Sequence, residues 1–215
     1  MRNLLEKLGR KFARLTTNQV VRRPGLWRLF RPLVRAQFNR AAPVWDQFRF
    51  PDSFKPLEAA LAEVSPPRRA LDIGTGTGAA AFLVARRFPT AEVVGVDLAA
   101  EMLGEAKRKT PPELVDRIRF EQADAERLPY PDESFDLVTL ANMIPFFDEL
   151  ERVLAPDGAL VFAFSGGAQT PIYVPPEKLR NELGRRGFTD FAEFEAGRGN
   201  SLIARKAPQG VAFSS

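Results

Sequence analysis

Three alternating glycines, Gly74, Gly76 and Gly78, follow the apolar run 70–73 and lead into a helical segment that starts near Gly78. Because glycine lacks a Cβ atom, such a turn can be tight, and a ligand can approach the backbone amides at the N-terminus of the helix. Three alternating glycines exceed what a simple strand-to-helix turn requires. The loop therefore favours a strand-turn-helix unit that binds a nucleotide-like ligand.

Short apolar runs alternate with helical segments after residue 68. The runs cover residues 70–73, 93–96, 118–120, 135–140 and 160–164, and helical segments start near Gly78, Ala99, Phe146 and Pro176. This alternation is typical of a parallel sheet covered by helices on both faces. Two last runs, 188–194 and 201–204, flank a turn-rich stretch and predict an antiparallel hairpin. We expect an α/β fold: a Rossmann-like, doubly wound, mostly parallel seven-stranded sheet with an antiparallel C-terminal hairpin, preceded by N-terminal helices.

The segment before residue 65 has helical patterns. Residues 2–16 interleave leucine and phenylalanine with Lys and Arg at helical spacing, which predicts a basic amphipathic helix. A second helix is expected from near Pro24, with a kink or break at Pro32. A third is expected from a cap at Asp52 or Ser53 to about Val64.

Charge is distributed unevenly along this chain, whose formal net charge is +4. Residues 1–50 hold 12 Lys and Arg against 2 Asp and Glu, whereas residues 51–215 hold 19 against 25. Such a cationic cluster attracts RNA or an anionic membrane surface, although a solvated Arg-rich face gives the same pattern. We divide the chain into a basic helical lid or extension at 1–64, a ligand-binding domain at 65–206 and a flexible tail at 207–215.

The chain contains no cysteine and no histidine. These absences exclude disulfides, thiolate nucleophiles, Ser-His-Asp triads and metal sites built from Cys or His. Any chemistry must then use carboxylates, amines, hydroxyls or a cofactor. The N-terminus lacks the apolar stretch of a secretory signal, and no segment is long enough to cross a bilayer. We expect a soluble, cytoplasmic protein, for which peripheral membrane contact through residues 2–16 stays open.

Asp97 ends the second apolar run, 21 residues after Gly76. At this spacing a carboxylate accepts hydrogen bonds from the hydroxyls of a ribose. Gly74, Gly76 and Ala79 also satisfy the dinucleotide fingerprint, so a nicotinamide or flavin enzyme is one interpretation. Residues 122–138 argue against it, because an Asp ends the third strand and only a short Pro-bounded loop precedes the fourth.

Five motifs occur in a fixed order between residues 68 and 165. They are Asp-x-Gly-x-Gly-x-Gly at 72–78, the acid at 97, Asp124-Ala125, Leu-Pro-Tyr-Pro-Asp-Glu-Ser-Phe-Asp at 128–136 and Leu-Ala-Pro-Asp-Gly at 154–158, before the fifth strand. In this order and spacing, residues 68–165 resemble a class I S-adenosylmethionine-dependent methyltransferase. The resemblance covers about half of the chain and implies that the domain at 65–206 binds S-adenosylmethionine.

The resemblance also implies roles for individual residues. Three glycines, Gly74, Gly76 and Gly78, would wrap the methionine part of the cofactor, and Asp72 would approach its ammonium group. Further implied contacts are Asp97 with the ribose, Asp124 and the Ala125 amide with the adenine edge, Leu98 and Met102 with the adenine ring, and Asn142 with the methionine moiety or the methyl acceptor. Leu98 and Met102 are equally consistent with ordinary core positions.

Methyl transfer from a sulfonium requires the protein mainly to align the acceptor and exclude water, so it needs no histidine. We therefore expect transfer to a small, apolar or amphipathic molecule beneath the N-terminal helices. Trp45 is expected either to cap the cofactor or to pack between lid and core. An RNA substrate bound by the basic arm, and a non-catalytic cofactor-binding protein at a membrane surface, stay open as alternatives. A catalytic residue, the acceptor atom and the oligomeric state do not follow from the sequence.

Overall fold

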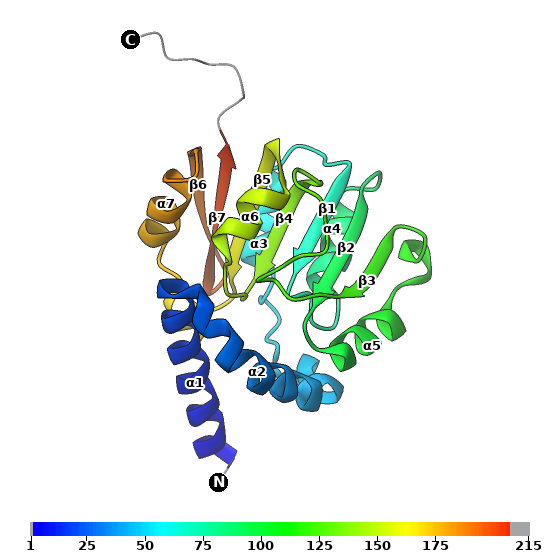
Figure 1. Cartoon of the computed structure of the whole chain (residues 1–215). Coiled ribbons are helices and arrows are strands. Elements are labelled where there is room, and N and C mark those ends of the chain that lie inside the picture. The colour runs from blue at the N-terminus through cyan, green and yellow to red at the C-terminus, as the bar shows by residue number, and fades with distance from the viewer. Residues whose placement is uncertain (1, 207–215) are drawn as a thin grey trace.

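The computed structural model describes residues 2–206, with side chains from residue 9 onward. Its centre is a seven-stranded sheet with the order β3-β2-β1-β4-β5-β7-β6 (Figure 1). Strands β1 to β5 are parallel, β7 pairs antiparallel with β5, and β6 pairs antiparallel with β7. The predicted sheet with its C-terminal hairpin is confirmed. The tail predicted at 207–215 and the side chains of residues 2–8 lie outside the described part.

Each predicted apolar run lies within an observed strand. The strands are β1 (Arg69–Ile73), β2 (Glu92–Asp97), β3 (Ile118–Gln122), β4 (Phe135–Ala141), β5 (Leu154–Phe164), β6 (Phe188–Ala196) and β7 (Gly199–Lys206). The expectation that residues 154–158 precede the fifth strand is wrong, because β5 already begins at Leu154. Pairing between β4 and β5 shifts register between Phe135 and Leu137, and this irregularity accommodates the additional residues of β5.

Helices precede the sheet and connect its strands. The α-helices are α1 (Arg2–Arg22), α2 (Trp27–Ala41), α3 (Lys55–Ala62), α4 (Ala79–Arg87), α5 (Ala100–Lys109), α6 (Phe147–Val153) and α7 (Pro176–Gly184). Single 3₁₀ segments are η1 (Pro24–Leu26), η2 (Ala42–Phe48), η3 (Pro112–Leu114) and η4 (Gly167–Gln169). The four predicted helix starts after residue 68 are confirmed to within a residue or so.

Three expectations for the N-terminal segment need correction. The first helix continues past residue 16 to Arg22, because Val20 and Val21 are buried and extend its packed face. The second helix begins at Trp27, after η1, and it continues without a break through Pro32. The third helix is not capped by Ser53, whose hydroxyl instead donates to the Phe50 carbonyl at 2.6 Å and closes the preceding turn.

Helices cover both faces of the sheet. On one face, apolar side chains of α3, α4 and α5, including Leu57, Val84 and Leu103, pack against the strands. On the other face, α6 and α7 contribute Leu150 and Leu179 to a second buried cluster. Successive residues of a strand point to opposite faces, so each central strand contributes to both cores.

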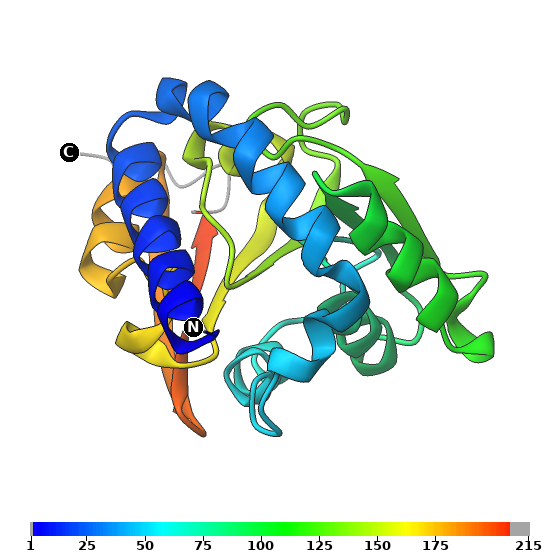
Figure 2. The same cartoon turned by 90° about the horizontal axis from the view of Figure 1, so that it is seen from below.

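The N-terminal helices lie across the sheet edge at which the parallel strands end (Figure 2). Val20, Val21 and Trp27 are buried in the same cluster as Phe146, which directly precedes α6. This layer is therefore part of the core packing and stands over the loops that follow the strands. Within residues 2–206, no helix combines the length and apolar character needed to span a membrane.

Candidate functional site

The glycine loop joins β1 to α4 beneath the N-terminal layer. Gly74, Gly76 and Gly78 all have positive φ, and Gly78 is the N-cap of α4. L-residues rarely adopt positive φ, which explains the glycine at each alternate position. The amides of Gly74 and Thr75 donate to the Val96 carbonyl of β2, at 2.8 and 2.9 Å. The loop is thereby fixed between β1 and β2.

Asp72 is a buried acid near the C-terminal end of β1. Its side chain is 1% exposed, and its Oδ1 accepts a 2.8 Å hydrogen bond from the Thr139 hydroxyl of β4. Its Oδ2 is buried and has no hydrogen-bond partner among the described residues. Burial raises the pKa of Asp72 to about 6. A buried carboxylate oxygen without a partner fits a cationic ligand group, which would supply the missing hydrogen bond and charge.

Asp97 ends β2 and binds the glycine loop. One carboxylate oxygen accepts the Gly76 amide and the other accepts the Ala99 amide, each at 2.9 Å. Burial raises the pKa of Asp97, and these backbone amides oppose that effect. Each oxygen retains a lone pair for a further donor, so the geometry suits a pair of hydroxyl groups.

Segment η2 closes over the glycine loop. The Trp45 indole lies beside Gly76, where a Cβ atom on the glycine would stand 3.6 Å from Trp45 Nε1. The Thr77 hydroxyl donates to Asp46 Oδ1 at 2.6 Å and accepts from Arg49 Nη2 at 2.7 Å. Lys109 of α5 donates to the other Asp46 oxygen at 2.8 Å. These contacts fix η2 to the loop.

The Asp46 carboxylate is the anionic centre of that contact. Burial acts to raise its pKa, but hydrogen bonds from Lys109 and Thr77 and the charge of Arg49 outweigh burial and hold the pKa below its usual value. Arg49 is half-buried, and burial lowers its pKa although Asp46 and Asp72 oppose this. The Arg49 guanidinium thus joins the lid to the glycine loop through its contacts with Asp46 and Thr77.

Asp124 follows β3 and is contacted by α2. Its Oδ1 accepts Trp27 Nε1 at 2.8 Å and the Glu126 amide at 3.1 Å, and its Oδ2 accepts Arg31 Nη1 at 3.0 Å. Oδ1 is thus fully used, whereas Oδ2 keeps one lone pair. Ala125 is buried in the same cluster as Trp27, and the half-buried Leu98 packs against that cluster.

The comparisons with known proteins identify the domain that holds these residues. Residues 71–162 match the family model described as "Methyltransferase domain". The chain is 46% identical to the demethylmenaquinone methyltransferase of Thermus thermophilus over 47% of this chain and 49% of that protein. It is 37% identical to the malonyl-[acyl-carrier protein] O-methyltransferase of Halorhodospira halophila over 63% of this chain and 49% of that protein. The chain spans about half the length of each relative.

A structural relative shares the fold. Phosphoethanolamine N-methyltransferase 2 of Haemonchus contortus, in complex with S-adenosyl-L-methionine, superposes with a TM-score of 0.62 at 18% identity. The superposition covers 80% of this chain and 57% of that one. Residues 71–162 form a methyltransferase domain. The resemblance predicted from the ordered motifs is confirmed, and S-adenosylmethionine is the cofactor expected of such a domain.

The structure brings most of the predicted residues to one edge of the methyltransferase domain. Asp72, the three glycines and Asp97 surround the start of α4, and Trp45 covers the loop. Met102 is buried with Ala42 and Ala99, in a small cluster against which Trp45 also packs. It therefore occupies a packing position beneath the lid.

Asn142 lies at the end of β4 and contacts β5. Its Oδ1 accepts the Ser165 amide at 3.0 Å, and its Nδ2 donates to the Ser165 hydroxyl at 3.1 Å. The neighbouring Met143 covers the glycine loop, since a Cβ atom on Gly74 would stand 2.7 Å from Met143 Sδ. Met143 therefore covers the glycine loop at Gly74, whereas the Asn142 side chain is held by Ser165.

Sequence reasoning missed four residues of the site: Trp27, Arg49, Thr77 and Met143. Thr77 and Met143 are sequence neighbours of predicted site residues, so their positions in the chain could have indicated that they belong to the site. Trp27 and Arg49 come from the N-terminal segment and reach loops far away in sequence, at Asp124 and Thr77. No spacing in the sequence indicates such contacts.

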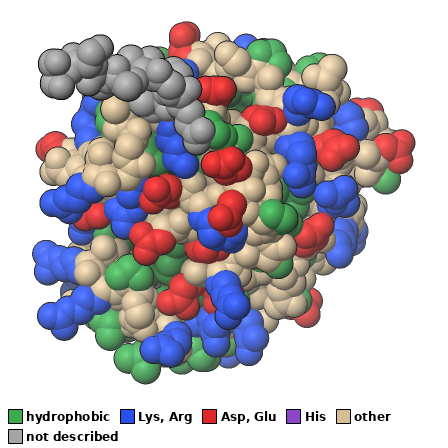
Figure 3. Space-filling view, turned by 45° about the horizontal axis from the view of Figure 1, so that its top comes forward, with side chains coloured by type: hydrophobic (Ala, Val, Ile, Leu, Met, Phe, Trp, Pro, Cys, Tyr) green, Lys and Arg blue, Asp and Glu red, His purple; other side chains and the backbone are tan. Residues whose placement is uncertain are grey.

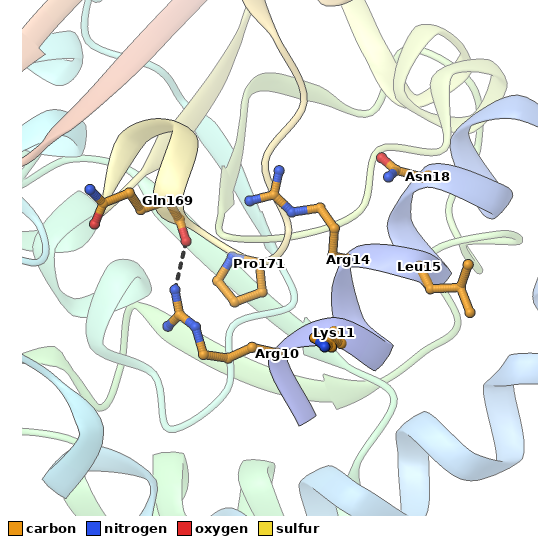
Figure 4. A pocket seen from close by; sticks show the side chains of 7 residues that line it. All are labelled: Arg10, Lys11, Arg14, Leu15, Asn18, Gln169 and Pro171. Carbon is orange, nitrogen blue, oxygen red and sulfur yellow. Dashed lines mark hydrogen bonds between the residues drawn. The ribbon is translucent and has the colours of Figure 1, made fainter. Parts of the chain in front are cut away.

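A separate hollow lies between α1 and η4, away from the methyltransferase loops (Figure 4). Its volume is about 420 Å³, and Arg10, Lys11 and Arg14 line it together with Gln169 and Pro171. The two arginines are occupied by backbone acceptors: Arg10 donates to the Gln169 carbonyl at 2.7 Å, and Arg14 donates to the Thr170 carbonyl at 2.9 Å. The hollow is therefore a seam between α1 and the domain.

Proposed function

We propose that this protein transfers a methyl group from S-adenosylmethionine to a small, apolar or amphipathic acceptor beneath the N-terminal helices. The observation that carries the proposal is the pair of carboxylates at the glycine loop. Asp72 has a buried oxygen without a partner, and Asp97 has a lone pair on each oxygen. An ammonium group and a ribose diol supply the donors that these two acids lack.

The remaining groups of the cofactor also find partners near the loop. Arg49 donates to Thr77 of the glycine loop, and its guanidinium is suited to the carboxylate of the methionine part. The free lone pair of Asp124 Oδ2 and the Ala125 amide suit the adenine edge, and Leu98 suits the adenine face. The residue types at this edge therefore match each end of the cofactor.

The protein's part in the reaction is alignment and exclusion of water. When bound, S-adenosylmethionine supplies a methyl group that its positive sulfur already activates. Trp45 and Met143 cover the glycine loop and would shield the reacting atoms from solvent. Holding the acceptor in line with the methyl group is the principal catalytic contribution, so no histidine base is needed.

The aromatic lining of the lid supports an apolar acceptor. Phe38 and Phe48 contact Trp45 edge to face, with ring centroids 5.2 and 6.4 Å away. Relatives named as acting on demethylmenaquinone and on malonyl-[acyl-carrier protein] support acceptors of low or mixed polarity. RNA is supported only by the charge of residues 1–50, and membrane contact through residues 2–16 only by their predicted amphipathic pattern. A cytoplasmic location belongs to the proposal as well.

A labelled methyl-transfer assay tests this function. The full chain is incubated with S-adenosylmethionine labelled in the methyl group and with either a quinone-containing lipid extract or total RNA. We expect label in the organic-soluble fraction and none in RNA. Label in RNA alone would overturn the acceptor class. Cofactor binding without transfer to either substrate would favour a non-catalytic role at a membrane surface.

A further inference from the structure

The N-terminal layer carries most of the exposed apolar side chains of this protein. Within the described residues, the large exposed apolar side chains are Leu15, Leu29, Leu33, Val44, Phe48 and Val115. All but Val115 lie in a stretch of less than a quarter of the chain. Single exposed apolar side chains are common on protein surfaces, but a concentration of this kind indicates a surface with a partner.

Helix α2 is apolar on two sides. Trp27, Phe30 and Val34 face the protein and pack in or against the main core. Leu29 and Leu33 lie one turn apart on the outer side, 70% and 60% exposed. Only the Trp27 side of α2 packs within this chain, and the outer side exposes Leu29 and Leu33.

Basic side chains surround this outer side. Exposed arginines of α1, α2 and the segment between them include Arg22, Arg23, Arg28, Arg35 and Arg40. Two others, Arg10 and Arg31, are exposed but bind the Gln169 carbonyl and the Asp124 carboxylate. Lys and Arg gather with hydrophobic side chains along the lower edge of the molecule in Figure 3, whereas Asp and Glu are frequent across the middle of that view. Aliphatic side chains that insert at a lipid interface, flanked by guanidinium groups that pair with phosphate headgroups, match an anionic membrane surface.

Helix α1 belongs to the same rigid layer. Arg14 donates to the carbonyls of Ala168 and Thr170 at 2.8 and 2.9 Å, and the Phe12 and Phe30 rings pack with centroids 6.2 Å apart. Leu15 is 53% exposed and borders the hollow between α1 and η4 (Figure 4). The layer formed by α1, α2 and η2 therefore presents its apolar and basic side chains on a fixed frame.

An aromatic path connects this layer with the glycine loop. Phe48, which is 58% exposed, contacts Trp45, and Trp45 lies beside Gly76. An apolar molecule dissolved in a bilayer could follow these rings to the site without crossing water. The exposed Phe48 of this layer is thus connected with the candidate site through Trp45.

We propose that the layer of α1, α2 and η2 docks on an anionic membrane surface, with Leu29 and Leu33 at the lipid interface, and that it receives a lipid-dissolved methyl acceptor beside Trp45. The acceptor route rests on the proposed function. The docking step does not, because it requires neither cofactor nor turnover.

Vesicle flotation of the full chain tests the docking. One set of vesicles contains equal parts of phosphatidylglycerol and phosphatidylcholine, and the other contains phosphatidylcholine alone. We expect the wild type to float with the anionic vesicles, more weakly at high salt, and not with the neutral ones. The double variant Leu29→Ser/Leu33→Ser should bind roughly tenfold more weakly. Val115→Ser is the matched control, since Val115 is equally exposed but outside the layer.

The outcomes separate docking from its alternatives. Absence of flotation, undiminished flotation of Leu29→Ser/Leu33→Ser, or an equal loss in Val115→Ser would overturn the proposal. The proposal would also be overturned if the double variant changed the sedimentation mass of the protein but not its flotation. The Leu29 and Leu33 face would then join two copies of the chain. Thermal melts and titration with S-adenosylhomocysteine check that each variant keeps its fold and its cofactor site. If the wild type did not bind S-adenosylhomocysteine, the result would count against the proposed function and not against membrane docking.

Discussion

The charge state of Asp72 couples ligand binding to stability at the level of a single residue. Burial raises its pKa from 3.8 to about 6, so the native state binds a proton more tightly than the unfolded chain. The ionised form is therefore the unfavourable one in the folded protein. Stability from this group is present below pH 3.8 and is lost as pH rises through about 6.

We expect Asp72→Asn to stabilise the ligand-free protein by about 1–3 kcal/mol at pH 7, because the neutral amide removes the cost of a buried charge. The gain should shrink as the pH approaches 4. Urea unfolding at both pH values measures it. The same variant should lose binding of S-adenosylhomocysteine. A destabilised variant that still binds would contradict this account of Asp72.

Cofactor binding should depend on pH through the same residue. An ammonium group binds the ionised carboxylate, so affinity for S-adenosylhomocysteine should fall as pH drops through about 6. We expect roughly tenfold weaker binding about one unit below that pKa. Calorimetric titration across this range checks it. Burial also raises the pKa of Asp97. The weaker-binding variant Asp97→Asn should keep this pH dependence if Asp72 causes it and lose the dependence if Asp97 does.

Residues within a local motif were predictable from the sequence. The glycines and Asp97 follow from strand-turn-helix spacing, because parallel strands bring their carboxyl ends to one edge of a sheet. Asp72 follows from the family resemblance of the motif at 72–78. Arg49 and Trp27 were not predictable, since each reaches its partner through tertiary packing of a segment without a diagnostic pattern. The cofactor roles of the predicted residues stay predictions.

At the level of elements, hydrophobic periodicity predicted the strands and the helices between them. It was less informative at residues such as Ser53 and Pro32, whose side chains are compatible with more than one local structure. Ser53 matches the N-cap pattern, yet its hydroxyl closes a turn with the Phe50 carbonyl. Pro32 matches a helix-breaking pattern, yet tertiary packing on both sides of it keeps α2 continuous. A competing local hydrogen bond decides the first region, and hydrophobic packing outweighs local preference in the second.

The contact between α2 and the loop after β3 gives a prediction for Trp27. Its indole and Arg31 orient Asp124 and leave one lone pair on Oδ2. Trp27→Phe keeps most of the packing and removes the hydrogen bond, so we expect S-adenosylhomocysteine binding to weaken by about 3- to 10-fold. Phe30→Leu, on the same helix side, should leave the affinity unchanged. Tighter binding by Trp27→Phe would mean that the indole competes with adenine for Asp124.

For the whole molecule, the uneven charge corresponds to a structural division. The excess of basic over acidic residues belongs to a layer across one sheet edge, and the more acidic remainder forms the sheet and its covering helices. That layer also supplies Val20, Val21 and Trp27 to the main core. Its helices are therefore needed for the fold as well as for the site.

Deletion of residues 1–51 should cost roughly 5 kcal/mol or more of stability, since the loss of Trp27 alone removes a fully buried aromatic side chain. Phe146 would then become exposed. Thermal melts and binding of an apolar dye measure the effect. A shortened chain with an unchanged melting temperature would show that the layer folds independently of the core.

Titration of S-adenosylhomocysteine into the full chain tests the central claim, that the acids of the glycine loop bind this cofactor. The wild type should bind, and Asp97→Asn, which keeps one oxygen for the loop amides, should bind at least roughly tenfold more weakly. Asp157→Asn, an exposed position in β5, should bind like the wild type. No binding by the wild type, or wild-type affinity in a folded Asp97→Asn variant, would contradict the claim.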